Sequence, residues 1–436
     1  MTFPPDWETS PLQDCLSAII DYRGKTPEKT SSGVPLITAK IVKNGRIEEP
    51  NEFIAEEDYD AWMTRGLPEP GDVVITTEAP LGEVAQLGNE KVALAQRIIL
   101  LRGDKQRLDN TYLRYCLNAG YVQSQLHGRA SGTTVTGIKQ SELRRVEIAL
   151  PPLEEQKRIA QTLRALDDKI ELNRRMNATL EAMAQALFKS WFVDFDPVKA
   201  KAAGRAPAGM EADTAALFPS EFVESELGLI PKGWEVGSIL TQAKLLSGGT
   251  PKTERPDYWN GNVKWASAKD VSQANQTFLI ETERTITTKG LEESATQLIP
   301  ALGTVVVARG ATTGRMVLFG KEMAMNQTCY ALVSSIGTPL ALHCQLRRTI
   351  DVLVHAAHGS VFNTITTNTF STSKTVLPSA ETLQSFERIA SPIFEKILTN
   401  TEECLSLATI RDALLPKLIS GQLRIPEAEA MAEAAL

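Results

Sequence analysis

The sequence has few cysteines, no long apolar run and no secretory start. Its five cysteines lie far apart and form no Cys-x-x-Cys motif: Cys15, Cys116, Cys329, Cys344 and Cys404. This spacing argues against a disulfide framework or a zinc cluster and is typical of a reduced, cytoplasmic protein. No run approaches the roughly 18 apolar residues of a membrane helix, and the first residues lack the basic and apolar regions of a signal peptide. We therefore expect a cytoplasmic protein without a membrane span.

The motifs of common enzyme classes are also missing. The sequence has no Gly-rich loop ending in Gly-Lys-Ser/Thr, no Asn/Asp-Pro-Pro-aromatic motif and no Gly-x-Gly-x-x-Gly after a strand. Glu155-Gln-Lys157 has the form Glu-x-Lys, but no Pro-Asp pair precedes it at nuclease spacing. His355 and His358 have no Glu or Cys nearby to complete a metal site. These absences predict a non-catalytic chain without a cofactor or a metal of its own.

The composition is that of an ordinary folded protein. The 436 residues are 42% hydrophobic and 23% charged, and this length predicts two or three domains. Lys and Arg together number 46 and Asp and Glu 53, so the formal net charge is −7. An acidic total does not exclude a nucleic-acid partner, because DNA responds to the charge of the local surface.

The chain contains an internal repeat. Three pairs of similar segments are each separated by 227 residues: those at Trp7 and Trp234, at Gly132 and Gly359, and at Ala186 and Ala413. Because one offset returns at the start, middle and end of the copies, we interpret the chain as a duplication. Each copy has a mixed part of roughly 145 residues followed by a long helix. Within the mixed parts we expect strands at 72–77 and 304–308, and short helices at 113–118 and 340–346.

Each predicted long helix has a seam with alternating steps of four and three residues. In the first helix the seam includes Ile159, Leu163, Leu166, Ile170, Asn173, Leu180 and Leu187. In the second it includes Ile393, Ile397, Asn400, Leu407 and Leu414. This period predicts that the two helices pair as a coiled coil, with the asparagines fixing the register. The alternative is that each helix packs only on its own mixed part.

Two further segments have less regular sequences. Residues 199–216 are rich in Ala, Gly and Pro and contain no aromatic side chain, so we expect a solvated linker. The segment after residue 426 alternates Glu with Ala and Met, and we expect a frayed helix there.

Basic residues occur among small polar ones in the predicted loops of both mixed parts. The candidates in the first copy are Arg23, Lys25, Thr26, Lys40, Arg97, Arg129, Thr133 and Thr134. Those in the second are Thr250, Lys252, Lys269, Arg309, Thr312, Thr313, Arg315, His358 and Ser360. Arg can hold guanine edges with two hydrogen bonds, and Lys and Thr suit phosphates, although a basic loop is more often a solvated surface. Two similar modules on a helical rod favour double-stranded DNA as the partner.

Five segments resemble the specificity (S) subunit of type I restriction–modification systems. They are PLEEQKRIA at 152–160, LDDKIELN at 166–173, MAQALFKSWFVDF at 183–195, ELGLIPKGW at 226–234 and LLPKLISGQL at 414–423. The resemblance covers nearly the whole chain. One departure is PSAETLQ at 378–384, where the first copy has PPLEEQ at 151–156.

The resemblance implies an α/β (α+β) fold in which two target-recognition domains are separated by two long antiparallel coiled-coil helices. The implied parts are a first recognition domain at 1–150, a central conserved helix at 151–195, a linker at 196–230, a second recognition domain at 231–377, a distal conserved helix at 378–425 and a flexible tail at 426–436. Each recognition domain would read one half of a bipartite, asymmetric DNA target.

The resemblance also implies partners that perform the chemistry. The conserved helices would dock two methyltransferase (M) subunits, which use S-adenosylmethionine to methylate adenine N6. Two restriction (R) subunits would add translocation and cleavage that depend on ATP and Mg²⁺. Two alternatives remain from the residues alone: a stand-alone nuclease or methyltransferase with unrecognised motifs, and a coiled-coil scaffold that binds no DNA.

Overall fold

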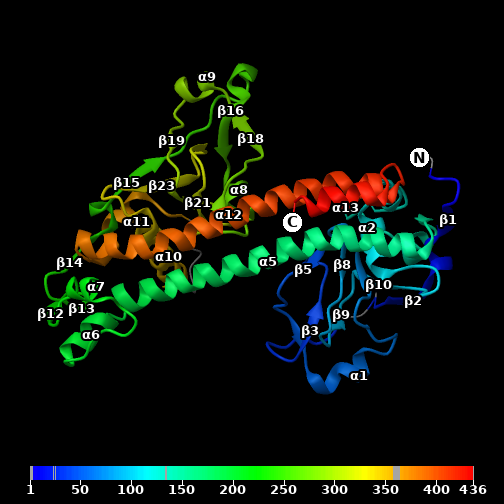
Figure 1. The fold of residues 1–436 in the computed structure, drawn as a ribbon, viewed down its shortest axis with the longest axis horizontal. Coiled ribbons are helices and arrows are strands. Elements are labelled where there is room, and N and C mark those ends of the chain that lie inside the picture. The colour runs from blue at the N-terminus through cyan, green and yellow to red at the C-terminus, as the bar shows by residue number, and fades with distance from the viewer. Residues whose placement is uncertain (1–2, 23, 25, 133–134, 357–363, 436) are drawn as a thin grey trace. The chain divides into compact units, whose positions relative to one another are not determined.

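The computed structural model of the protein describes residues 3–22, 24, 26–132, 135–356 and 364–435. The chain divides into two compact units. Unit 1 consists of Met1–Ile170 with Ser406–Leu436, and unit 2 of Glu171–Leu405. The two long helices, α5 (Leu153–Phe192) and α12 (Ala380–Ile419), each contribute residues to both units (Figure 1).

Unit 1 is built around a four-stranded antiparallel sheet. The strand order is β2-β10-β7-β8, with bounds Leu16–Asp21, Ile98–Gly103, Val73–Thr77 and Leu81–Gln86. Every residue of the inner strand β7 is buried. Its Val-Val-Ile-Thr-Thr sequence is β-branched throughout, which suits a strand covered on both faces. The strand predicted at 72–77 and the helix predicted at 113–118, found as α2 (Asn110–Asn118), are therefore confirmed.

Further strands and helices complete unit 1. β3 (Val34–Ile37) pairs antiparallel with β6 (Phe53–Ile54) and parallel with β9 (Ala93–Leu94). The first strand, β1 (Glu8–Pro11), pairs antiparallel with β11 (Glu147–Leu150), which leads into α5. The remaining elements are β4 (Val42–Lys43), β5 (Arg46–Ile47), α1 (Tyr59–Trp62), α3 (Gly120–Gly128), α4 (Gln140–Leu143) and α13 (Ile425–Glu433).

Unit 2 repeats this arrangement with one further strand in its main sheet. Its main sheet has the order β15-β23-β20-β21-β17, with bounds Ala243–Ser247, Cys329–Ser334, Thr304–Val307, Met316–Phe319 and Phe278–Leu279. The first four strands correspond in order to β2-β10-β7-β8 of unit 1. Likewise, β14 (Glu235–Ser238) pairs antiparallel with β24 (Lys374–Leu377), as β1 does with β11. The predicted duplicated mixed fold is confirmed.

A second sheet and several helices complete unit 2. The sheet has the order β18-β16-β22-β19, with bounds Arg284–Ile286, Trp259–Ala266, Met323–Met325 and Leu298–Ile299. The helices are α6 (Asp196–Ala202), α7 (Ala212–Ala216), α8 (Ala268–Gln273), α9 (Thr288–Glu292), α10 (Pro339–Ala356) and α11 (Thr367–Thr372). A hairpin joins β12 (Phe222–Ser225) to β13 (Gly228–Pro231).

The segment predicted as a solvated linker is folded. It contributes to α6 and α7; most of residues 199–216 are exposed, as predicted, but Thr214 is buried, as are Val198 and Phe218 on either side of the segment. The ring of Phe218 packs edge-on against Trp191 with centroids 5.2 Å apart, and the Lys201 ammonium donates to the carbonyl of Ala215. The Ala-rich sequence shows no hydrophobic periodicity that would predict these contacts. The contacts of Phe218 and Lys201 hold the segment against Trp191 near the end of α5.

The tail also differs from the flexible segment expected at 426–436. It forms α13, in which Ile425, Ala428 and Ala432 are buried. Within unit 1 the Arg158 guanidinium on α5 pairs with Glu429 at 2.8 Å. Small alanine side chains at helical spacing let α13 pack closely. No described helix combines the length and the apolar character needed to cross a bilayer.

Candidate nucleic-acid interface and helix seam

Six of the predicted DNA-contacting residues lie outside the described part of the chain. They are Arg23, Lys25, Thr133, Thr134, His358 and Ser360. The structure places the other candidates on exposed loops and short helices of the two units.

In unit 1 two predicted sites come together where β7 ends. The Thr77 N–H donates to the carbonyl of Arg97 at 2.8 Å, and the Thr77 carbonyl accepts from Ile138 N–H at 2.9 Å. Glu78 and Gly137 form an isolated β-bridge, as do Gly137 and Ser131. We call Thr77, Arg97 and Gly137–Ile138 the first loop junction. It brings Arg97 and the segment after Arg129 to one end of the sheet.

Unit 2 repeats this junction at equivalent positions. The Ala308 N–H donates to the carbonyl of Thr328 at 2.8 Å, and the Ala308 carbonyl accepts from Ile365 N–H at 2.8 Å. Arg309 and Thr364 form the corresponding β-bridge. We call Ala308, Thr328 and Thr364–Ile365 the second loop junction.

Four more predicted candidates lie on two loops beside the second loop junction. The Thr250 hydroxyl donates to the side chain of Gln327, directly before Thr328. The tight loop that holds Thr312, Thr313 and Arg315 is closed by a hydrogen bond from Gly314 N–H to the Val307 carbonyl at 2.9 Å. Lys252 lies in the loop after β15 and Lys269 on α8, and both are exposed.

The candidate cations of the two units differ in their partners. In unit 1, Arg97 pairs with Glu78 at 2.9 Å, Arg129 with Glu142 at 3.5 Å and Lys40 with Glu52 at 3.9 Å. Exposed pairs of this kind contribute little stability, so their cations can exchange a carboxylate for a phosphate at low cost. Within the described chain, Arg309 and Arg315 of unit 2 are exposed and form no ion pair.

Most of the predicted seam residues are buried within their units. Those with little exposure are Ile159, Leu163, Leu166, Ile170, Asn173, Ile397, Asn400, Leu407 and Leu414. Leu180, Leu187 and Ile393 are only partly buried. In unit 2, Asn173 donates to Glu403 at 2.9 Å, and Asn177 is bonded to Asn400 at 2.9 Å. The residue numbers of the α12 partners fall from 403 to 400 as those on α5 rise from 173 to 177, so the two helices run antiparallel here.

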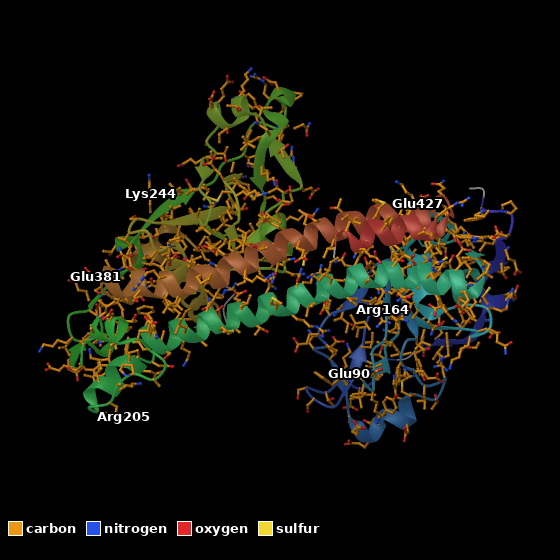
Figure 2. All side chains as sticks on the ribbon, viewed as in Figure 1. Glu90, Arg164, Arg205, Lys244, Glu381 and Glu427 are labelled. Carbon is orange, nitrogen blue, oxygen red and sulfur yellow. The ribbon has the colours of Figure 1, made fainter. Side chains whose placement is uncertain are left out.

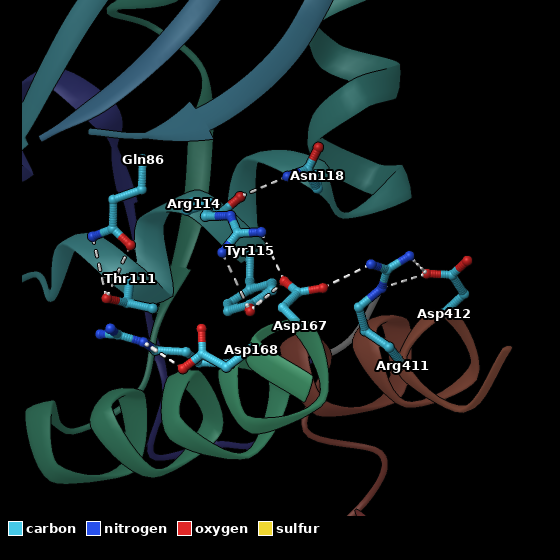
Figure 3. Close-up of polar contacts among 10 residues, drawn as sticks. Gln86, Thr111, Arg114, Tyr115, Asn118, Asp167, Asp168, Arg411 and Asp412 are labelled. Atoms are coloured by element: carbon cyan, nitrogen blue, oxygen red, sulfur yellow. Dashed lines mark hydrogen bonds and ion pairs between the residues drawn. The ribbon is translucent and has the colours of Figure 1, made fainter. Parts of the chain in front are cut away.

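In unit 1 a charged cluster joins three helices, and sequence analysis did not single out its centre, Asp167. This α5 carboxylate accepts from Arg114 of α2, from the Tyr115 hydroxyl and from Arg411 of α12, each at 2.7 Å (Figure 3). Burial raises the pKa of Tyr115 well above its usual range, so the phenol remains a donor. Asp167 lies one position outside the seam, next to Leu166, and no signal in the sequence links it to Arg114 or Arg411.

The described residues contain no group of three or more His, Cys, Asp or Glu side chains that could hold a metal ion. His355 and His358, which the sequence places three residues apart, cannot be assessed as a pair because residue 358 lies outside the description.

Comparison with known proteins identifies relatives over most of the chain. A family model described as the type I restriction modification DNA specificity domain matches residues 4–182 and 231–403. The specificity subunit of the type I restriction enzyme MjaIX from Methanocaldococcus jannaschii is 28% identical over 439 aligned residues, covering 97% of this chain and 95% of the relative. The HindI specificity subunit from Haemophilus influenzae is 30% identical over 320 residues, covering 64% and 69% respectively.

A solved structure has the same fold. The S subunit of a type I restriction–modification system from M. genitalium superimposes with a TM-score of 0.56 over 96% of this chain and 98% of that one. The sequence identity is 14%, so this likeness concerns the fold alone.

Proposed function

The chain belongs to the family of type I restriction–modification DNA specificity subunits, and from this premise we propose that each of its two units reads one half of a bipartite, asymmetric DNA target. The observation that supports this reading is the repeated loop junction. Three separate loops meet at Thr77 in unit 1 and at Ala308 in unit 2, through the same pair of backbone hydrogen bonds.

The two junctions share a backbone and differ in their side chains. Arg97 of the first junction is paired with Glu78, whereas Arg309 of the second forms no ion pair within the described chain. A shared backbone gives two modules of one type, and side chains that reach base edges provide specificity. Two modules with unlike side chains would therefore select two unlike half-targets.

We further propose that the long helices dock the methyltransferase subunits. In unit 2, α5 exposes Leu172, Met176 and Met183, with 54%, 36% and 54% of each residue accessible. Their spacing of four and seven residues places them on one side of the helix. An exposed apolar stripe is typical of a protein–protein interface, and flexible methionines adapt well to a partner surface.

The chemistry is assigned to partner subunits. Two M subunits would methylate adenine with S-adenosylmethionine, and two R subunits would use ATP and Mg²⁺. In this scheme the purified chain transfers no methyl group to DNA by itself, and activity appears when M subunits are added. Methyl transfer by the isolated chain would contradict the assignment.

Domain exchange tests the proposed reading of DNA. Residues 1–150 are replaced by the first recognition domain of another S subunit, and the chimera is expressed with its M subunits in a host without adenine methylation. Sequencing of the methylated sites should show one half of the target changed and the other retained. Exchange of residues 231–377 is the matched control and should change the opposite half. A change in both halves by either exchange would contradict modular reading.

A further inference from the structure

The second sheet of unit 2 contains a stacked arginine that sequence analysis did not select. Trp259 and Trp265 on β16 are nearly buried, and their rings meet edge to face with centroids 5.3 Å apart. Arg284 of β18 is the register partner of Trp265. Its guanidinium carbon lies 3.5 Å from the centroid of the Trp259 ring and 5.8 Å from that of Trp265. An exposed guanidinium is thus held over an aromatic support (Figure 1, β16 and β18).

Three other cations of unit 2 near this support, Arg255, Lys269 and Lys289, are neutralised by carboxylates. Arg255 and Lys289 both pair with Asp257 at 2.8 Å, and Lys269 pairs with Glu283 at 2.7 Å. The hydrogen bonds that Arg255 and Lys289 donate to Asp257 hold the pKa of its carboxyl well below the usual range. In the described chain no carboxylate pairs with Arg284. Arg284 therefore combines a fixed ring contact with unused N–H donors.

The same two tryptophans hold a loop that was selected from sequence. The indole N–H of Trp265 donates to the carbonyl of Gly249 at 3.0 Å, and that of Trp259 donates to the carbonyl of Lys252 at 3.2 Å. This loop contains Thr250, which bonds to Gln327 at the second loop junction. Arg284 covers the face of the ring whose edge binds the loop. The arginine and the loop therefore share one rigid support next to the junction.

We propose that Arg284 reads a guanine edge in the half-target bound by unit 2. This inference rests on the proposed DNA-reading function. A bidentate contact to guanine O6 and N7 needs two donors in one plane, and stacking on an indole fixes the plane of a guanidinium before binding. A guanidinium can also hold a phosphate with two hydrogen bonds, so loss of preference at one base pair is the result that distinguishes a base contact from a phosphate contact. The guanidinium of Arg284 is held over a ring, is exposed, and has no carboxylate partner in the described chain. These three features together favour a contact to a base.

The test compares Arg284→Ala and Arg284→Lys with Arg255→Ala. Arg255 is the matched control, because it also lies over an aromatic ring, that of Tyr258 at 4.6 Å, while its donors are occupied by Asp257. Each full chain is assembled with M subunits. Binding is measured by fluorescence anisotropy on duplexes that contain the target mapped by methylation sequencing, with every base pair changed in turn. Tryptophan fluorescence and thermal melting check that each variant is folded.

Both Arg284 variants should bind the intact target roughly 10- to 100-fold more weakly, which corresponds to loss of one bidentate base contact. They should also lose their preference at a single G·C pair, and that pair should lie in the half assigned to unit 2 by domain exchange. Arg255→Ala should bind within about twofold of the wild type. Arg284→Lys keeps the charge and most of the side chain, so it remains informative if the alanine variant is unstable.

Three outcomes would overturn the assignment of Arg284. They are unchanged binding by folded variants, an equal loss of affinity for all sequences, and a changed preference located in the other half-target. The proposed function fails in a different way, because the wild-type assembly would then show no sequence preference at all.

Discussion

The amide of Asn400 donates a hydrogen bond to the Oδ1 atom of Asn177, 2.9 Å away, at the buried seam of α5 and α12. Asn400 is the duplicate of Asn173, and Cys404 is the duplicate of Asn177, at the common offset of 227 residues. Asn173 in turn lies beside Cys404, where its hydrogen bond partly opposes the rise in the pKa of the thiol that burial causes. If the two copies were identical, position 404 would be an asparagine and would contact Asn173 as Asn177 contacts Asn400. Because position 404 is a cysteine, the structure has one amide-to-amide contact of this kind. Such a polar contact in an apolar seam fixes which residues pair.

Replacement of Asn177 by Leu should destabilise the protein by about 1–3 kcal/mol, because the buried amide of Asn400 loses its acceptor. The double variant Asn177→Leu/Asn400→Leu should recover much of this loss, since no polar group is then left unpaired. Urea denaturation of the full chain measures both values. If the double variant is as unstable as the single one, the unpaired amide of Asn400 is not the cause of the lost stability, and this explanation is wrong.

The Asp167 cluster predicts a sharp contrast between two neighbouring carboxylates. Asp167→Asn leaves Arg114 and Arg411 without their shared negative charge, and we expect a loss of about 2–4 kcal/mol, because the site is largely buried. Among the described residues, Asp168 (Figure 3) pairs only with the exposed Arg164 (Figure 2), at 3.3 Å. Asp168→Asn should therefore cost less than about 0.5 kcal/mol. Equal urea midpoints for the two variants would contradict the structural role of Asp167.

The sequence predicted the repeated architecture because both of its signals are local. Periodic seams mark α5 and α12, and β-branched runs mark β7 and β20. Gly137 and Thr364, which occupy matching β-bridges, are separated by the same offset of 227 residues that the sequence shows at Trp7 and Trp234. The folded linker was missed because its stability depends on Phe218 reaching Trp191, a contact that composition does not reveal.

The polar sites were harder to predict, because they depend on contacts between distant segments. Arg255 pairs with the Asp257 carboxylate, whereas no carboxylate of the described chain pairs with Arg284, and no spacing rule in the sequence distinguishes the two arginines. Asp167 could not be singled out from sequence, because its partners Arg114 and Arg411 are 53 and 244 residues away in the chain. Basic loop residues could be nominated from sequence, whereas their grouping at Thr77 and Ala308 required the fold.

Two leucines of α5 should separate folding from assembly. Leu166 is fully buried in unit 1, so Leu166→Asp places an unpaired charge in an apolar seam and should cost several kcal/mol. Leu172 is 54% exposed, so Leu172→Asp should leave the urea midpoint nearly unchanged. If the exposed stripe docks an M subunit, the second variant should bind M subunits at least about tenfold more weakly in a pull-down titration, because the interface would bury the new charge. Normal M binding by Leu172→Asp would exclude this stripe as the dock.

A buried histidine in unit 2 makes the stability of the protein depend on pH. Burial, aided by the charge of Arg347, lowers the pKa of His343 from 6.5 to about 3, and its Nδ1 atom lies 3.3 Å from the Thr304 hydroxyl. Between these two values the unfolded state binds more protons than the folded state. The contribution of His343 is therefore fully present above pH 6.5 and is lost as the pH falls toward 3, with a slope of up to about 1.4 kcal/mol per pH unit. His343→Gln should flatten the pH dependence of the unfolding free energy in this window by that amount. His127 is exposed, so His127→Gln should keep the wild-type slope. If the unfolding free energy depends on pH in the same way in the wild type and both variants, the pKa of His343 is not lowered by folding, and the prediction is wrong.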